Sequence, residues 1–181
     1  MAGPDGELPN LLAANDFELF QVPQQFAVDA AAIAQRWKQL QQLAHPDRFA
    51  AQASAAQRLA MQWSVRINEA HQRLKDPLRR AAYLCELAGH PIQAESNTHM
   101  ASDFLMQQMQ WREQLEEAEK PAELEVLKLE MRTARELALA ACENAIDLQA
   151  DWPQAVECVR RLMFMQRFEQ DIDRRLDQMD L

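Results

Sequence analysis

The sequence predicts an all-α fold, and three features of its composition support this prediction. Gly occurs only 3 times in 181 residues. Ala, Leu, Gln, Glu, Met and Arg, which lose little conformational freedom in a helix, dominate the chain. Runs of Val, Ile and Thr that would form strands are absent. The shortage of Gly also excludes glycine-rich phosphate-binding loops, so the sequence argues against nucleotide binding.

Capping residues and apolar spacing predict four helices in the first half of the chain. Residues 1–15 show no periodicity and are expected to form a flexible tail. The helices are expected to begin at Asp16, after Asp29, at Ser54 and at Asp76-Pro77, and the last to end at Gly89. The predicted buried faces are Ile33, Trp37, Leu40 and Ala44 in the second helix and Leu59, Trp63, Ile67, Ala70 and Leu74 in the third.

Three longer amphipathic helices are predicted in the second half, after a polar stretch at 91–101 that is typical of a linker. They are expected to run from Ser102 to about Lys120, from Pro121 to about Gln149, and from Asp151 to the end. Their short connections predict an antiparallel three-helix bundle. The predicted buried faces of the last two helices are Leu124, Leu127, Met131, Ala134, Ala138 and Ala141, and Val159, Leu162, Met165, Ile172, Leu176 and Met179.

Charge is unevenly distributed along the chain. The net charge is −9, and residues 1–90 carry equal numbers of acidic and basic side chains. Residues 91–181 therefore hold the whole excess of negative charge. Phosphate contacts need basic patches, so this distribution argues against nucleic acid as a partner.

The cysteines and histidines do not form a metal-binding pattern. Cys85, Cys142 and Cys158 are widely spaced and include no CxxC pair, so we expect buried thiols in a reducing compartment and no zinc site. His71, His90 and His99 also lack metal-ligand spacing and are expected at the surface or in caps. No amino-terminal signal pattern or long apolar run is present. We therefore expect a soluble, cytoplasmic protein that needs no membrane and no cofactor.

His45-Pro46-Asp47 lies between the second and third predicted helices. Pro46 fixes its own φ and disfavours a helical conformation at His45, so the helix must stop there. An imidazole ring and a carboxylate are then presented at the tip of a helical hairpin. An isolated tripeptide of this kind is usually an ordinary helix terminator, so the flanking sequence has to decide its meaning.

The flanking sequence resembles the J-domain, the module through which J-proteins act on DnaK-type chaperones. The resemblance covers four features in register, and their order and spacing make chance an unsatisfactory explanation. They are the basic helix with Arg36 and Lys38, then His45-Pro46-Asp47-Arg48-Phe49, Ile67-Asn68-Glu69-Ala70, and Asp76-Pro77-Leu78-Arg79-Arg80-Ala81-Ala82-Tyr83-Leu84.

The rest of the chain resembles the HscB/Jac1 family of iron–sulfur co-chaperones, in which a J-domain is followed by a three-helix bundle. The supporting residues are Arg80-Ala81-Ala82-Tyr83-Leu84-Cys85-Glu86-Leu87-Ala88-Gly89, Asp103-Phe104-Leu105-Met106, Arg112-Glu113 and Val159-Arg160-Arg161-Leu162-Met163-Phe164. The resemblance implies an L-shaped, all-α molecule. It also implies a tail at 1–15, a J-domain at 16–90, a linker at 91–101 and a client-binding bundle at 102–181.

The resemblance implies that the hairpin tip engages the chaperone HscA and triggers ATP hydrolysis there. The chain itself would then not be an enzyme. The residues that carry over to chaperone binding are His45, Pro46, Asp47, Arg36, Lys38 and Arg48. J-domains often carry more positive charge on the helix that here holds Gln39, Gln41 and Gln42, so electrostatic steering is expected to be weaker.

A second surface follows from the helical wheel of the helix that begins at Ser102. With Phe104 at zero and about 100° per residue, one face holds Trp111, Leu115 and Ala118 and can contact the bundle. Leu105, Met106 and Met109 fall on the far side, where they either bind a partner or pack on the J-domain.

The resemblance favours partner binding, because the matching positions of HscB contact the iron–sulfur scaffold protein IscU. The residues that carry over are Leu105, Met106, Met109, Gln110, Glu113 and Phe164. Family members often have an acidic residue where Gln110 stands.

Two other functions are considered. The chain could be a J-domain co-chaperone with an unrelated client, which would be favoured if Ser at Leu105, Met106 and Phe164 left IscU binding intact. It could also be a helical metal-dependent hydrolase that uses His45 and Asp47, but the sequence supplies no further clustered His or Asp residues.

Overall fold

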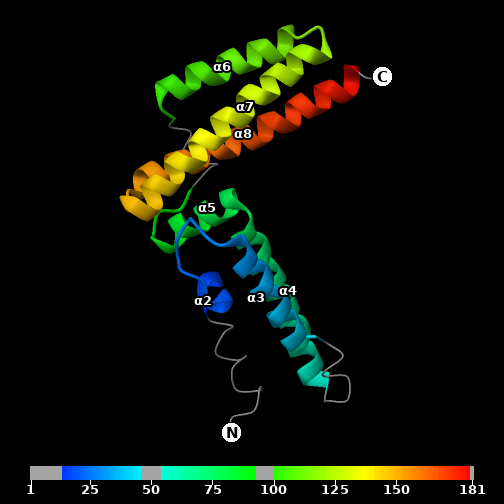
Figure 1. Cartoon of the computed structure of the whole chain (residues 1–181), viewed down its shortest axis with the longest axis vertical. Coiled ribbons are helices and arrows are strands. Elements are labelled where there is room, and N and C mark those ends of the chain that lie inside the picture. The colour runs from blue at the N-terminus through cyan, green and yellow to red at the C-terminus, as the bar shows by residue number, and fades with distance from the viewer. Residues whose placement is uncertain (1–13, 46–53, 93–99, 180–181) are drawn as a thin grey trace. The chain divides into compact units, whose positions relative to one another are not determined.

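The computed structural model describes residues 14–45, 54–92 and 100–179, and every regular element within these ranges is a helix (Figure 1). The predicted all-α fold is confirmed. The chain divides into two compact units, residues 1–83 and 84–181, which are described separately. Of the predicted tail, residues 1–13 lie outside the described residues. The side chain of Asn15 caps the first helix by accepting a hydrogen bond from the Glu18 N–H at 2.9 Å.

The first unit contains α2, α3, α4 and the start of α5. Their bounds are Asp16–Phe20, Ala30–Leu43, Ser54–Lys75 and Pro77–Leu87. The predicted caps are confirmed: the Asp29 carboxylate accepts from the Ala31 N–H, and the Asp76 carboxylate accepts from the Arg79 N–H, both at 2.8 Å. Gly89 adopts φ +80°, the left-handed conformation that commonly follows the end of a helix.

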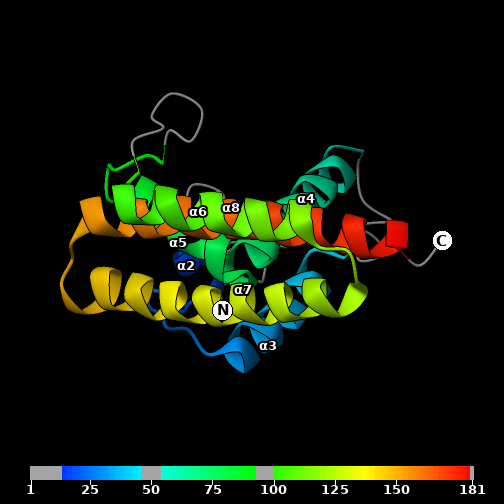
Figure 2. The same ribbon diagram turned by 90° about the horizontal axis from the view of Figure 1, so that it is seen from above.

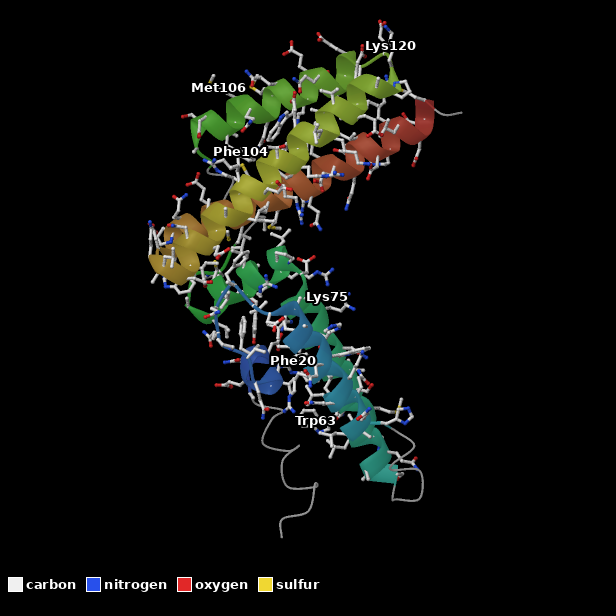
Figure 3. All side chains as sticks on the ribbon, viewed as in Figure 1. Phe20, Trp63, Lys75, Phe104, Met106 and Lys120 are labelled. Carbon is white, nitrogen blue, oxygen red and sulfur yellow. The ribbon has the colours of Figure 1, made fainter. Side chains whose placement is uncertain are left out.

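The core of the first unit lies between α3 and α4 and is closed by the aromatic residues of α2. Its largest fully buried side chains are Trp63, Phe17, Phe20, Leu19, Ile33, Leu40, Ile67 and Leu74. Figure 3 shows Phe20 and Trp63 within this unit. The prediction for Leu59 was wrong, because its side chain is 40% exposed and the neighbouring Ala60 is buried instead. Leu59 sits at the edge of the apolar stripe of α4, where spacing alone does not separate core from surface.

A buried charge holds α2 against α4. Asp16 is completely buried, and its carboxylate forms ion pairs with Arg66 at 2.6 Å and with Arg73 at 2.7 Å. The Asp16 backbone N–H donates to the Tyr83 hydroxyl at 3.1 Å. The Tyr83 ring stacks on Phe17 and lies 4.7 Å below the Arg73 guanidinium carbon. This cluster joins α2, α4 and α5.

Another arginine, Arg80, connects the end of α4 to the segment before α3. Arg80 is buried, and its Nε donates to the Phe26 carbonyl at 2.8 Å. Its Nη1 donates to the Leu74 carbonyl, and its guanidinium lies 5.0 Å from the centre of the Phe26 ring. The arginine thus satisfies a carbonyl at the end of α4, which has no partner within the helix.

The second unit is a bundle of three long helices (Figures 1 and 2). They are α6 at Ser102–Glu117, α7 at Pro121–Glu143 and α8 at Trp152–Met179, and a π-helix, η3, at Asn144–Leu148 follows α7. The Glu123 carboxylate accepts from the backbone N–H groups of Glu119 and Lys120, which lowers its pKa and fixes the start of α7. The predicted starts are confirmed. The predicted α-helical ends were slightly late, since α6 stops at Glu117 and η3 replaces the last turn of α7.

The bundle core contains residues from all three helices. Its buried members are Phe104, Trp111, Ala118, Leu124, Leu127, Met131, Met165, Phe168 and Ile172. Lys128 of α7 and Asp173 of α8 form an ion pair at 2.6 Å on its surface, and this contact raises the pKa of Lys128. The prediction for Ala141 was wrong: Ala141 is exposed and Cys142 is buried. Near its end, the buried face of α7 includes Cys142, and it continues into η3 through the buried residues Ala145 and Ile146.

The segment after Tyr83 belongs to the second unit, so the division falls inside α5, upstream of the stretch 91–101 predicted as a linker. The Arg160 guanidinium donates two hydrogen bonds to the Ile92 carbonyl, at 3.0 and 2.8 Å. The His90 ring stacks on Trp152. These contacts attach residues 84–92 to α8. Residues 93–99 lie outside the described residues.

The three cysteines are free and buried, which confirms the prediction for their side chains. Burial raises the pKa of the Cys85 thiol to about 11, with further contributions from Cys158 and Glu86. Burial also raises the pKa of Cys158. Both thiols therefore stay protonated near neutral pH and are weak nucleophiles. Within the described ranges, no helix is long and apolar enough to cross a membrane.

Replacing Asp16 by Asn should lower the free energy of unfolding of the first unit by about 2–3 kcal/mol, because two arginines lose their shared buried partner. The value lies at the low end for a buried pair because Arg66 and Arg73 are partly exposed. Amide hydrogen exchange of α2–α4 in native conditions measures the change. The exposed Glu69→Gln on α4 is the control and should stay within about 0.5 kcal/mol. Equal protection in both variants would contradict the role given to Asp16.

Candidate functional site

The end of the α3–α4 hairpin is the first candidate surface. α3 ends at Leu43 and the Ala44 N–H donates to the Leu40 carbonyl, so the helix stops before Pro46 as predicted. His45 is exposed. Pro46, Asp47 and Arg48 lie outside the described residues, and their role in chaperone binding stays a prediction.

Polar and aromatic contacts hold together α3 and α4, the two helices that flank the His-Pro-Asp sequence. The Asn68 side-chain oxygen accepts from Trp37 Nε1 at 3.0 Å and from Gln41 Nε2 at 2.7 Å. His71 stacks on Trp37, with ring centres 4.8 Å apart, and on Phe20 at 6.4 Å. Trp37 was predicted as core and is only half-buried. His71 was predicted at the surface or in a cap, but it packs between two aromatic rings.

Arg36 and Lys38 point in different directions from α3. Positions two residues apart in the sequence are separated by about 200° around a helix. One flat partner surface therefore cannot contact the side chains of Arg36 and Lys38 equally. Lys38 is exposed. Arg36 is half-buried, and its Nη1 donates to Gln39 at 3.3 Å. Lys38 is therefore the more accessible cation of the two.

The outer face of α6 is the second candidate surface. Leu105, Met106 and Met109 are 44%, 64% and 72% exposed. Gln110 and Glu113 on the same face are also exposed. Figure 3 shows Met106 pointing away from the bundle and Phe104 pointing into it. The three residues that the helical wheel places on the far side of α6 are thus accessible together with Gln110 and Glu113, and we call these five residues the α6 face.

Phe164 of α8 lies beside the α6 face and packs against the bundle core. Its ring contacts Phe104 edge-on at 5.7 Å, and it stacks on Trp111 at 6.3 Å and on Phe168 at 5.7 Å. The Arg112 guanidinium lies 5.9 Å from its ring centre. Phe164 is half-buried, so a substitution there would disturb the fold as well as any contact with a partner.

A pocket of about 380 Å³ opens between α6 and α8, next to the α6 face. Leu105, Phe164 and Phe168 form apolar parts of its wall. Three arginines also line it, namely Arg112, Arg160 and Arg167. Residue spacing does not reveal this basic group, because Arg112 of α6 lies about 50 positions before the two arginines of α8 in the sequence.

Comparison with known proteins decides the family. A family model described as the HSCB C-terminal oligomerisation domain matches residues 100–173. A co-chaperone protein HscB homolog from Bordetella avium is 44% identical over 163 residues, which are 89% of this chain and 97% of that protein. The chain belongs to the HscB family of co-chaperones. The predicted resemblance is therefore confirmed, and relatives of the chain are J-protein co-chaperones rather than enzymes.

Solved HscB structures share the fold along nearly the whole chain. Chaperone HscB from Vibrio cholerae has a TM-score of 0.85 at 36% identity and covers 91% of this chain and 99% of its own. Human co-chaperone HscB has a TM-score of 0.86 at 27% identity and covers 93% of this chain and 84% of its own. Membership of the HscB co-chaperone family implies that the chain has a chaperone partner. The assignment of individual residues to partners stays a prediction.

The metal-dependent hydrolase considered from the sequence receives no support. Among the residues that the structure describes, no group of three or more His, Cys, Asp or Glu side chains is placed to hold a metal ion. Asp47, which that alternative requires, lies outside them. The family relationship to co-chaperones favours binding over hydrolysis as the role of the hairpin.

The packing of His71 predicts a pH dependence for the hairpin. Burial, followed by the charge of Lys75, lowers the pKa of His71 below its usual 6.5. The unfolded chain therefore takes up the proton first, so the stability of the first unit should be complete above about pH 6.5 and fall as the pH drops through the folded-state pKa. An NMR titration of the imidazole, combined with hydrogen exchange at pH 7.5 and 5.5, measures both effects. His71→Phe keeps the stacking and should flatten this part of the dependence. A His71 pKa above 6.5 would contradict the assignment.

Proposed function

We propose that the chain stimulates the ATPase of a DnaK-type chaperone, HscA, and delivers the iron–sulfur scaffold IscU to it during iron–sulfur cluster biogenesis and transfer. The hairpin end binds the chaperone through His45, Pro46, Asp47, Arg36, Lys38 and Arg48. The α6 face, with Phe164, binds the scaffold.

The chaperone half of the proposal is supported by family membership and by the geometry of α3. The helix ends where the His-Pro-Asp sequence begins, and His45 is accessible. Asp47 would accept hydrogen bonds from a basic group of the chaperone, a charge-assisted contact worth about 1.5–3 kcal/mol. The bond that breaks belongs to ATP on the chaperone, so the hairpin acts by binding and not as an acid or base.

The scaffold half is carried by one observation, the exposure of the α6 face on a helix whose other side is buried. Phe104 and Trp111 are 1% and 4% exposed, whereas Met106 and Met109 on the other side are 64% and 72% exposed. An adjoining set of large apolar side chains in water is typical of a protein-binding surface. Methionine suits such a surface because its flexible thioether adapts to the shape of a partner.

Carrying both surfaces on one chain would couple the two binding events. A scaffold molecule held by the α6 face is confined near a chaperone held by the hairpin, which raises its effective concentration there. The gain needs no direct contact between the two surfaces. The chain would thus act as an adaptor whose output is hydrolysis by its partner.

Replacing Asp47 by Asn should abolish the stimulation of HscA, because the neutral amide cannot replace the carboxylate in a charge-assisted contact. Steady-state ATP turnover by HscA should fall to near its unstimulated rate, and the affinity for IscU should stay unchanged. Asp177→Asn, an exposed residue of α8, is the matched control and should stimulate normally. Normal stimulation by the Asp47 variant would refute the role assigned to the loop.

The double substitution Met106→Ser and Met109→Ser should weaken IscU binding by about 10-fold or more, because two exposed apolar contacts are lost without damage to the core. Isothermal titration calorimetry measures the affinity. The control is Val126→Ser with Leu129→Ser on α7, whose side chains are 59% and 61% exposed. Phe164 is avoided because its ring packs against Phe104, Trp111 and Phe168, so its replacement would also disturb the fold. If IscU bound both double variants equally well, the α6 face would serve a different client.

A further inference from the structure

The basic pocket between α6 and α8 is formed by matching stripes on the two helices. On α8, Arg160, Phe164 and Arg167 are four and three residues apart and therefore lie on one side of the helix. On α6, Leu105 and Arg112 are seven residues apart and face the same opening. Each stripe thus combines an apolar side chain with a guanidinium group.

The pocket is a positive region in the acidic half of the chain. Residues 91–181 hold the whole net charge of −9. One carboxylate, that of Asp171, also lines the pocket, and it is paired with Arg174. Arg112, Arg160 and Arg167 therefore outnumber the acidic groups at this place, against the trend of the surrounding sequence.

The three guanidinium groups differ in how they are held. Arg160 is fixed, because its Nε and Nη2 both donate to the Ile92 carbonyl. Arg112 lies over the Phe164 ring, which restricts it without using its hydrogen-bond donors. Arg167 is exposed. In the part of the chain that the structure describes, neither Arg112 nor Arg167 forms an ion pair with a carboxylate. Donors therefore remain available beside an aromatic wall.

We infer that this pocket binds an acidic side chain of the scaffold protein, next to an apolar side chain that packs on Leu105 and Phe164. Guanidinium groups bind carboxylates through paired N–H···O bonds, which gives the contact both strength and direction. The apolar wall supplies the second half of the recognition. The inference rests on the proposed function and specifies the chemistry of the bound segment: a carboxylate adjoining an apolar residue.

The scaffold-binding surface then has two parts, the α6 face and the basic pocket, which recognise different groups of the partner. The α6 face, with Met106, Met109 and Glu113, offers adaptable apolar contact and negative charge. The pocket, through Arg112 and Arg167, selects negative charge on the partner. A partner must then present its acidic group at the α8 side of α6, which fixes the orientation in which it binds.

Reversing the charge of the pocket tests the inference. IscU binding is measured by isothermal titration calorimetry with Arg167→Glu, Arg112→Glu and Arg167→Lys. Each reversal should weaken binding by about 10-fold or more, whereas Arg167→Lys should stay within about 5-fold because the charge is kept. Arg132→Glu on α7, an exposed residue outside the pocket, is the matched control and should change affinity by less than about 2-fold. Arg167 is the decisive position, because its side chain is exposed and its substitution should leave the fold unchanged.

A charge exchange identifies the bound group. Each exposed Asp or Glu of IscU is replaced by Lys, and one such variant should recover affinity for Arg167→Glu while losing it for the unchanged chain. Wild-type affinity of Arg167→Glu, or an equal loss with Arg132→Glu, would overturn the pocket assignment. If Met106→Ser with Met109→Ser weakened binding while Arg167→Glu did not, the proposed function would stand and only this inference would fall. No binding of IscU to the unchanged chain would overturn both.

Discussion

Aromatic contacts between α6 and α8 determine which side of α6 faces the bundle. Phe104 and Trp111 are buried against Phe164 and Phe168, in edge-on and stacked arrangements with ring centres 5.7–6.3 Å apart. Such pairs contribute about 0.5–1.5 kcal/mol each beyond the burial of their area.

Once the rings of Phe104 and Trp111 are buried, helical geometry determines which other side chains of α6 face water. Side chains about 100–200° away on α6 have to face water, and these are the α6 face. The same packing brings Leu105 and Arg112 of α6 next to Phe164 and Arg167 of α8 and so creates the basic pocket. A core interaction therefore determines which residues a partner can reach.

In the first unit, the packing of α3 against α4 determines where the ends of the two helices that flank residues 46–53 lie. Buried or shared polar groups stabilise this unit. Asp16 joins α2 to Arg66 and Arg73 of α4. Asn68 accepts hydrogen bonds from two residues of α3, and Arg80 satisfies a carbonyl at the end of α4. Asn68 and Arg80, two motif residues outside the His-Pro-Asp sequence, thus have an architectural role, because their contacts hold the first unit together.

The sequence was sufficient for the helices and for the exposed side of α6. Helix starts are local events, so Asp29, Asp76 and Asp151 could be recognised from the residues alone. The helical wheel separated Trp111 from Met109 correctly because α6 has one clear aromatic side. Periodicity failed at Leu59 and Ala141, where a stripe reaches its edge and the neighbouring helix decides which residue is covered.

Other features could not be predicted because they depend on residues that meet only in three dimensions. The Asp16 carboxylate meets arginines 50 and 57 positions later in the chain, and nothing in its local sequence marks it as buried. The pocket combines Arg112 with Arg160 and Arg167, which spacing along one helix cannot reveal. Phe164 was recognised through the family resemblance, yet its packing against the bundle core follows only from the arrangement of α8 and α6.

The central claim is that one chain couples scaffold binding to ATP hydrolysis by a separate chaperone. The most direct test is the concentration of IscU that gives half-maximal ATP turnover by HscA, measured with and without this protein and with its Met109→Ser variant. The unchanged chain should lower this concentration and the variant should lower it much less, while both should stimulate HscA equally when IscU is absent. An equal lowering by the variant, or no lowering by the unchanged chain, would contradict the account.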